Sequence, residues 1–308
     1  MKLIFGIKPT RIHIGHILSI FNFIKKEKYK SLKINIKDIY CLIGDIHKFA
    51  SIESNFNIKQ DIETIKTISS KLAINYYQQS KLPSEYFIMY HIISFFCKIN
   101  DLNKVFKINY KNNTINNFAK FSYPVLMCND IILLNPCTVL VGSDQIHNVR
   151  FIKNILSNIQ KLYNLQLDIK FEIIDIKILS LNDNNKMSTS DKSNSGQIFL
   201  DMNNDEIYKI IMQAKTQSKM PKTYNELEDS TKNLYLIYSI IKNLEIEYVI
   251  NIFSEKNFQE FKQHLYFAIV ELFNFYKNLN NLNNKYDIHH IINNIIIKNF
   301  NLIYSTIF

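Results

Sequence analysis

The sequence predicts an α/β protein in which a doubly wound parallel sheet is followed by an α-helical domain. Short, continuous apolar runs alternate with longer segments of helical periodicity over the first 200 residues. From about residue 204 the periodicity is helical almost to the end of the chain. Because strands that alternate with helices form a parallel sheet, we expect ligands to bind beyond the carboxyl ends of the strands.

The expected strands are short and mostly apolar. They span residues 2–7, 39–44, 86–90 and 138–142. Helices are expected between and after them, at residues 14–24, 58–79, 91–105, 124–134 and 146–163. A polar stretch at residues 182–195, rich in Asn and Ser, is predicted to be a mobile loop. We therefore expect two domains, residues 1–200 and residues 201–308.

The composition favours a globular cytoplasmic protein. The chain has 308 residues, of which 47% are hydrophobic, enough to form a core. Its four cysteines lie far apart and form no CxxC pair, so we expect neither a zinc site nor a disulfide framework. No cleavable apolar segment precedes the first strand, and the apolar segment 288–308 is too interrupted to span a bilayer. We expect no contact with a membrane.

The chain is basic, with a formal net charge of +10. Such an excess of Lys and Arg suits a protein that binds phosphate backbones and releases counterions. The chain is also rich in Ile, Lys and Asn, as an A+T-rich coding sequence would make it. The charge alone leaves both explanations open.

The tetrapeptide His13-Ile14-Gly15-His16 follows the first expected strand. Gly15 would let a ligand approach the backbone at a helix start, where free N–H groups favour anions. His13 and His16 are three residues apart and share a helix face, from which imidazoles can donate hydrogen bonds to phosphate oxygens. The motif predicts an ATP phosphate as the ligand, although a tetrapeptide of this type also occurs in other nucleotidyltransferases.

A second motif, Lys186-Met187-Ser188-Thr189-Ser190, lies in the expected loop. A lysine and several hydroxyl groups can hold the pyrophosphate leaving group while the α-phosphate is attacked. A solvated linker would have a similar composition. The order of the two motifs, on either side of the alternating strands and helices, favours a nucleotide site.

The chain resembles the class I aminoacyl-tRNA synthetases, and the tryptophanyl-tRNA synthetases in particular, over about residues 2–240. The first motif spells the family's HIGH, and the second is one residue from its KMSKS. The segments at residues 5–10, 44–49 and 139–145 are also similar to the family, and residues 123–134 resemble its tryptophan-pocket helix. The resemblance implies a Rossmann-like catalytic domain at residues 1–200. It also implies a helical domain at 201–308 that binds the tRNA anticodon.

The resemblance implies a pocket for L-tryptophan. Asp130 would accept the indole N–H, and a ligand without that donor would leave the carboxylate unpaired. Tyr123 and Gln145 would hold the α-amino group. The other implied pocket residues are Phe5, Gly6, His47, Met127, Val139 and Val141.

The resemblance also implies a two-step reaction. Tryptophan attacks ATP to give tryptophanyl-adenylate, and the tryptophanyl group then passes to the 3′ end of tRNA(Trp). The catalytic residues implied are His13, His16, Lys186, Ser188 and Ser190. The implied ATP-binding residues are Lys8, Pro9, Thr10, Gly15, His16, Gly142, Ser143, Asp144, Ile178, Lys186, Met187, Ser188, Thr189 and Ser190.

No residue is expected to bind a metal directly, because phosphates and water would hold most of the Mg²⁺ coordination sphere. Family members form homodimers, so we expect a homodimer here.

The chain departs from the family pattern in its opening loop, where Lys8 also replaces a usual Gln, and in the signature loop. Its opening loop is shortened, and Thr189 replaces the second lysine of the signature loop. Loss of that charge would weaken contacts to the phosphates by about 1–3 kcal/mol, unless Lys8, Arg11 or Lys192 compensates. Two alternatives therefore stay open: a tyrosyl-tRNA synthetase, and a non-catalytic paralogue that binds tRNA or a nucleotide.

Overall fold

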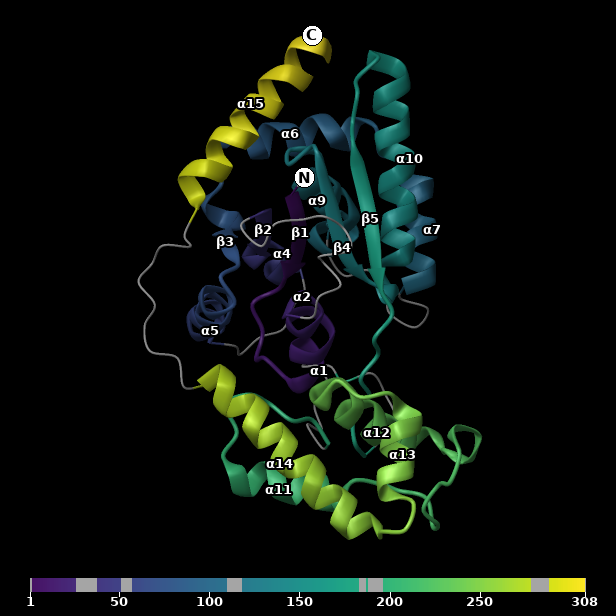
Figure 1. Cartoon of the computed structure of the whole chain (residues 1–308). Coiled ribbons are helices and arrows are strands. Elements are labelled where there is room, and N and C mark those ends of the chain that lie inside the picture. Colours follow the sequence, from purple (N-terminus) through teal and green to yellow (C-terminus); the bar gives the residue numbers. More distant parts are fainter. Residues whose placement is uncertain are drawn as a thin grey trace. The chain divides into compact units, whose positions relative to one another are not determined.

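A computed structural model describes residues 2–25, 38–50, 57–109, 118–182, 187, 196–277 and 288–307. The chain divides into two compact units made of interleaved segments (Figure 1). The first unit comprises Met1–Pro9, Lys30–Asp175 and Leu282–Phe308, and the second comprises Thr10–Tyr29 and Ile176–Asn281. These units differ from two domains that meet near residue 200, because the first signature belongs to the second unit and the C-terminal helix to the first.

The first unit contains a five-stranded parallel sheet. Its strands are β1 (Lys2–Ile7), β2 (Ile39–Ile43), β3 (Asn75–Gln78), β4 (Cys137–Gly142) and β5 (Ile169–Ile174), in the order β3-β2-β1-β4-β5. The doubly wound parallel sheet that the sequence predicts is therefore confirmed. The strand order reverses between β1 and β4, and ligands of such sheets bind at the carboxyl ends of the strands on either side of this point.

The register fixes which side chains share a face of the sheet. Ile4 lies opposite Tyr40 on one side and Val139 on the other. Because side chains alternate along a strand, Gly6 and Val141 lie on this same face, and Phe5 lies on the opposite one. Ile4, Tyr40, Val139 and Val141 belong to one core cluster that also holds residues of helix α9.

Helices cover the sheet of the first unit. They are α4 (Asp45–Ala50), α5 (Ile58–Lys71), α6 (Ser84–Phe95), α7 (Ile99–Asn109), α8 (Phe118–Phe121), α9 (Tyr123–Ile132), α10 (Ile146–Tyr163) and α15 (His289–Ile307). Helix α5 contacts β2 and β3, α10 contacts α7 and α9, and α15 contacts α6 and β3. The Asn299 amide of α15 donates to the carbonyls of Leu133 and Asn135 at 2.8 Å, which ties the C-terminal helix to this unit.

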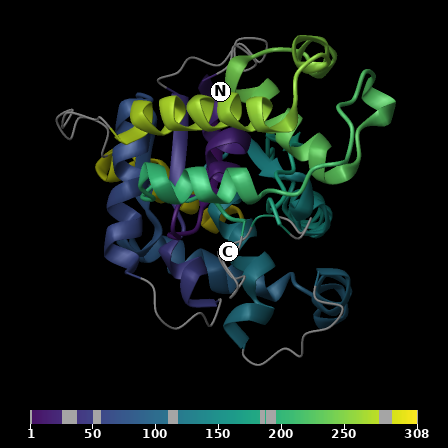
Figure 2. The ribbon, with the colours of Figure 1, turned by 90° about the horizontal axis from the view of Figure 1, so that it is seen from below.

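The second unit is helical. It contains α1 (Ile14–His16), the π-helical turn η1 (Ile17–Phe21), α2 (Asn22–Lys25), α11 (Asn204–Gln213), α12 (Asp229–Lys242), α13 (Ile246–Phe253) and α14 (Phe258–Lys277). Helices α11 and α14 lie side by side in both ribbon views (Figures 1 and 2). The rings of Tyr235 and Phe261 stack at 4.4 Å in its core, and Phe253 packs against Phe261.

Several secondary-structure predictions differ from the structure. The single helix predicted at 91–105 is the end of α6 followed by α7. The helix predicted at 58–79 ends at Lys71, because Ala73 adopts a left-handed backbone with φ of 55° and the chain then enters β3. The strand predicted at 86–90 is part of α6, whose buried residues Tyr86, Met89 and Ile93 have helical spacing. Strand β5 was not predicted. The predicted loop at 182–195 lies almost entirely outside the described residues.

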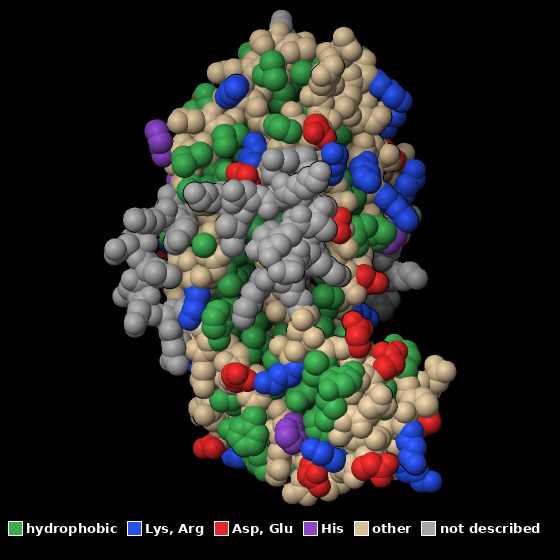
Figure 3. Space-filling model, in the orientation of Figure 1, with side chains coloured by type: hydrophobic (Ala, Val, Ile, Leu, Met, Phe, Trp, Pro, Cys, Tyr) green, Lys and Arg blue, Asp and Glu red, His purple; other side chains and the backbone are tan. Residues whose placement is uncertain are grey.

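No helix in the described part of the chain is long and apolar enough to cross a membrane. The face in Figure 3 carries Lys and Arg side chains on both units, with Asp and Glu side chains among them. The four cysteines are free. Burial raises the pKa of the Cys41, Cys97 and Cys137 thiols to about 12.

Candidate active site

The first signature begins with a buried histidine. His13 is 5% exposed, and its ring stacks on the half-buried ring of His16 with 3.8 Å between centroids. A methyl group at position 15 would lie 2.9 Å from the Cε1 and Nδ1 atoms of His13. Glycine is therefore needed at position 15 to make room for the His13 ring.

Backbone hydrogen bonds join the first signature to the segment that follows the second one. The Ile14 N–H donates to the Ile198 carbonyl at 2.9 Å, and the Leu200 N–H donates to the Ile12 carbonyl at 2.8 Å. His13 and Phe199 form an antiparallel bridge between these bonds. Two segments far apart in the sequence are thus held together in the second unit.

Ile178 provides a further link between the two signatures. The Met187 N–H donates to the Ile178 carbonyl at 3.1 Å. A methyl group at Gly15 would lie 3.7 Å from the Cβ atom of Ile178. Ile178 therefore lies next to both signatures, as expected for residues that would bind one nucleotide. Of the second motif only Met187 is described, and Lys186, Ser188, Thr189, Ser190 and Lys192 lie outside the described residues.

The turn after β4 contains more predicted ATP-binding residues. Gly142 ends the strand, and a methyl group there would lie 2.5 Å from Oδ1 of the exposed Asp144. The Gln145 amide donates to Asp144 Oδ2 at 3.2 Å and accepts from Asn148 at 2.8 Å. Glycine at 142 thus allows this turn to bring the Asp144 carboxylate close to the backbone.

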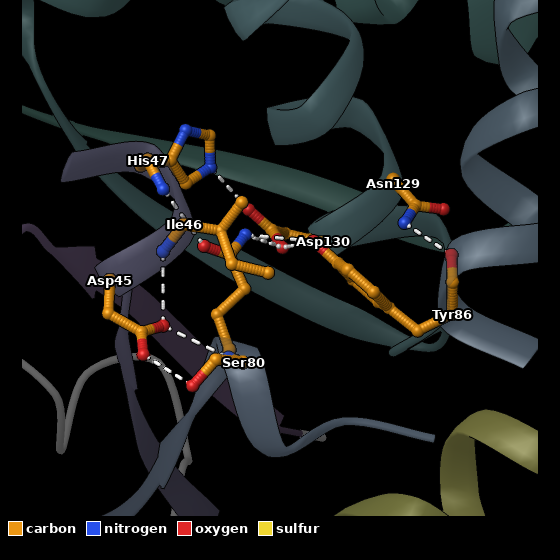
Figure 4. Close-up of polar contacts among 8 residues, drawn as sticks. Asp45, Ile46, His47, Ser80, Tyr86, Asn129 and Asp130 are labelled. Atoms are coloured by element: carbon orange, nitrogen blue, oxygen red, sulfur yellow. Dashed lines mark hydrogen bonds and ion pairs between the residues drawn. The ribbon is translucent and has the colours of Figure 1, made fainter. Parts of the chain in front are cut away.

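The predicted pocket residue Asp130 lies at the centre of a buried hydrogen-bond network (Figure 4). The residue is 9% exposed, and it is carried by α9. The Oδ2 atom lies 2.7 Å from His47 Nε2. The Oδ1 atom accepts from the Tyr86 hydroxyl at 2.6 Å and from Gln79 Nε2 at 2.8 Å. A buried carboxylate with three such partners is an acceptor held in a fixed orientation.

Gln79 and Tyr86 were not among the predicted site residues. Gln79 directly follows β3, within a segment that we predicted as helix, and Tyr86 was placed in a strand. Burial and the neighbouring Asp130 carboxylate raise the pKa of Tyr86 well above its ordinary value, so its hydroxyl keeps its proton. A signal for β3 in the sequence would have placed Gln79 beyond the carboxyl end of a strand, where ligands bind.

The other predicted pocket residues divide between the two faces of the sheet. Gly6 is exposed, and a methyl group there would meet no described atom closer than Leu42 Cδ2 at 4.0 Å. It shares its face with Val139 and Val141. Phe5 points to the opposite face and is 1% exposed, so it does not form one wall of a pocket with the two valines.

Helix α9 also carries the half-buried residues Tyr123 and Met127. The ring of Tyr123 packs against that of His47 with 4.4 Å between centroids. Met127 packs against the core cluster that holds Val139 and Val141. The structure thus brings His47, Tyr123 and Asp130 together, as the resemblance implies.

The cations that we expected to compensate for Thr189 differ in their surroundings. Arg11 Nε lies 2.9 Å from both carboxylate oxygens of Asp201, and its guanidinium lies 4.1 Å from the Phe199 ring centroid. Lys8 is exposed, with its Nζ 6.0 Å from the ring centroid of Tyr123. Within the described residues, no group of three or more His, Cys, Asp or Glu side chains could hold a metal ion.

Comparisons with known proteins agree with these motifs. The family model described as tRNA synthetases class I (W and Y) matches residues 1–274. The tryptophan–tRNA ligase of Malacoplasma penetrans is 29% identical, over 99% of this chain and 97% of that protein.

Two solved structures have the same fold. The tryptophanyl-tRNA synthetase of Mycoplasma pneumoniae superimposes with a TM-score of 0.75 at 22% identity, over 99% of this chain and 94% of the other. That of Campylobacter jejuni, complexed with ADP and tryptophan, gives 0.71 at 21% identity, over 100% and 97%. The resemblance seen in the sequence is confirmed, and the chain belongs to the class I tRNA synthetases of the tryptophan and tyrosine family, which are aminoacyl-tRNA synthetase enzymes.

Proposed function

We propose that the chain is a tryptophan–tRNA ligase, which activates L-tryptophan with ATP and transfers it to tRNA(Trp). The observation that carries the proposal is the buried Asp130 carboxylate, held as an acceptor by His47, Gln79 and Tyr86. An indole N–H has a single proton to donate, and a buried acceptor selects strongly for a ligand that provides one. The relatives named above, which are tryptophan enzymes by name, support the same amino acid.

The first chemical step is an in-line displacement at phosphorus. A carboxylate oxygen of tryptophan attacks the α-phosphorus of Mg-ATP, and the bond to the bridging oxygen of pyrophosphate breaks. The protein needs only to position the reactants and to stabilise charge on the phosphate oxygens. His13, His16 and the Lys186 loop are the groups that we assign to this work, and the Mg²⁺ enters with the nucleotide.

In the second step, a ribose hydroxyl of the terminal adenosine of tRNA attacks the adenylate carbonyl. The ester forms as AMP leaves. We assign anticodon binding to helices of the segment 201–308, and we propose a cytoplasmic homodimer as the working form. The net charge of +10 supports an encounter with a polyanion such as tRNA.

Thr189 leaves the signature loop one cation short. We propose that Lys8, Arg11 or Lys192 supplies the missing charge, and of these Arg11 has its Nε 2.9 Å from the Asp201 carboxylate. Pro9, Thr10, Ser143 and Ser190 complete the ATP-binding set that the family motifs imply.

Aminoacylation tests the proposal. Labelled tryptophan and labelled tyrosine are each offered with transcripts of tRNA(Trp) and tRNA(Tyr). We expect tryptophan to be attached to tRNA(Trp) and no other pair to react. Attachment of tyrosine to tRNA(Tyr) would identify a tyrosyl-tRNA synthetase, and no product with any pair would favour the non-catalytic paralogue.

A further inference from the structure

We propose that Gln79 and Tyr86 are positioning residues that occupy Oδ1 of Asp130, so that Oδ2 keeps the one acceptor position offered to a ring N–H. The proposal rests on the proposed function and deepens it, because it names which carboxylate oxygen binds the ligand. The ligand class is an amino acid whose heteroaromatic ring carries an N–H donor.

The count of hydrogen bonds distinguishes the two oxygens. A carboxylate offers about four acceptor positions, two on each oxygen. Tyr86 and Gln79 take both positions on Oδ1, at 2.6 and 2.8 Å. His47 takes one position on Oδ2, at 2.7 Å. Within the described part of the chain, one acceptor position on Oδ2 is left without a partner.

The direction of each proton in this network can be assigned. The Oε1 atom of Gln79 accepts from the backbone N–H of His47 at 3.2 Å, so the amide nitrogen must face Asp130. That nitrogen also donates to the Tyr86 hydroxyl at 2.8 Å, which leaves the hydroxyl proton of Tyr86 for Asp130. Both groups on Oδ1 therefore donate their hydrogen bonds to the carboxylate.

A second carboxylate holds Gln79 in place. The Asp45 side chain accepts from Gln78 Nε2 at 2.7 Å. It accepts from the backbone N–H of Ser80 at 3.0 Å as well (Figure 4), so it binds residues on both sides of Gln79. It also accepts from the Ser80 hydroxyl. Gln79 itself has no exposed surface. These contacts leave its amide little freedom to rotate.

Tyr86 is anchored from the other side. The Asn129 amide donates to the Tyr86 carbonyl at 2.9 Å, which joins α6 to α9 next to Asp130. Tyr86 is 1% exposed. Since the two donors and the carboxylate are all fixed, Oδ2 cannot exchange places with Oδ1 when a ligand binds.

Tyr77 offers a matched control. It is also a buried tyrosine, 1% exposed, but its hydroxyl has no hydrogen-bond partner in the described part of the chain. Removing that hydroxyl should leave both donors on Oδ1 of Asp130 in place. Tyr86→Phe, Gln79→Met and Tyr77→Phe can therefore be compared as a set.

The experiment compares tryptophan with its benzothienyl analogue, in which sulfur replaces the ring N–H. ATP–pyrophosphate exchange gives KM and kcat for each, and urea unfolding monitors folding of each variant. We expect Tyr86→Phe and Gln79→Met to raise the KM for tryptophan by about tenfold and to leave that for the analogue unchanged. The kcat should change little, and Tyr77→Phe should match the unaltered chain.

Discrimination is the KM for the analogue divided by the KM for tryptophan. A ratio that stays within about twofold of that of the unaltered chain in both folded variants would overturn the proposal. An equal loss of discrimination in Tyr77→Phe would overturn it as well. A direct measurement of tryptophan binding distinguishes failure of this proposal from failure of the proposed function. The chain contains no tryptophan, so indole fluorescence comes from the ligand alone, and its change when the chain is added reports binding. Binding without exchange would contradict only the proposed function, whereas absence of tryptophan binding would contradict both.

Gln79→Glu provides a readout that a purely structural role would not change. A second carboxylate beside Asp130 raises the pKa of the pair, so that the two share a proton at low pH. While the introduced carboxyl group is protonated it can still donate to Oδ1. We expect preference for tryptophan over the analogue at low pH and loss of that preference as pH rises, whereas a pH-independent preference would contradict the assigned role.

Discussion

The Nε2 atom of His47 lies 2.7 Å from Oδ2 of Asp130, and the two side chains are only 7% and 8% exposed. Together with Gln79 and Tyr86, His47 surrounds the carboxylate with groups that can donate. An amide in place of the carboxylate would turn an N–H₂ group toward some of these donors. The pocket is therefore built around an acceptor at position 130.

Asp130→Asn should weaken both folding and tryptophan binding. We expect the free energy of unfolding to fall by about 1–3 kcal/mol, because buried donors lose their partner. The KM for tryptophan in pyrophosphate exchange should rise as well. Asp168→Asn is the control, since that carboxylate is 61% exposed and its nearest cation is 3.9 Å away. Equal effects of the two substitutions in urea unfolding would count against the network.

Gly6 tests the position of the pocket on the sheet. A methyl group there meets no described atom closer than 4.0 Å, so Gly6→Ala should fold normally. If the space above Gly6 and Val141 holds the ligand, the methyl group should overpack the complex and raise the KM for tryptophan by about tenfold. An unchanged KM would place the ligand elsewhere. The kcat serves as the internal control.

Gly15→Ala should affect the nucleotide step instead. The added methyl group would lie 2.9 Å from the His13 ring, which must then move away from His16. We expect the kcat of pyrophosphate exchange to fall by at least about tenfold, since phosphate contacts depend on the position of these rings. Tryptophan binding, followed by ligand fluorescence, should stay unchanged. A loss of binding equal to the loss of kcat would contradict separate roles for the two sets of residues.

The strands and site residues that could be predicted from the sequence are those that depend on a local apolar run or on a motif. Strands β1, β2 and β4 are continuous apolar runs and were predicted, whereas β3 and β5 were not. Strand β3 follows α5 without a glycine or proline stop signal, because Ala73 makes the left-handed turn. The assignment of Asp130 and His47 to the pocket rests on family motifs.

Gln79 and Tyr86 could not be found in this way. Their role depends on a strand end and a helix face that only the folded chain brings to Asp130. The aromatic run that begins at Tyr86 favoured a strand by propensity, but burial of Tyr86, Met89 and Ile93 against α9 and the core made it a helix.

The buried thiol of Cys41 predicts a pH dependence of stability. Burial raises its pKa from the ordinary value of 9.0 to about 12. As pH rises above 9.0 the unfolded chain loses this proton first, so the stability contributed by the neutral thiol is present below 9.0 and is lost toward 12. We expect a slope of about 1.36 kcal/mol per pH unit from this group.

Urea unfolding at a series of alkaline pH values measures this slope. Cys41→Ala should reduce it by about the contribution of one thiol. Ile65→Val, a buried substitution without a titrating group, should lower stability equally at every pH. A Cys41→Ala curve parallel to that of the unaltered chain would show that Cys41 titrates alike in the folded and unfolded states.

Amino-acid-dependent ATP–pyrophosphate exchange tests the central claim most directly. Parallel reactions of the purified chain contain tryptophan, tyrosine or no amino acid. The structure and the proposed function together predict exchange with tryptophan alone, through the pocket that contains Asp130. Exchange with tyrosine instead would contradict the assignment of that pocket, and exchange with neither amino acid would contradict the assignment of an activating enzyme.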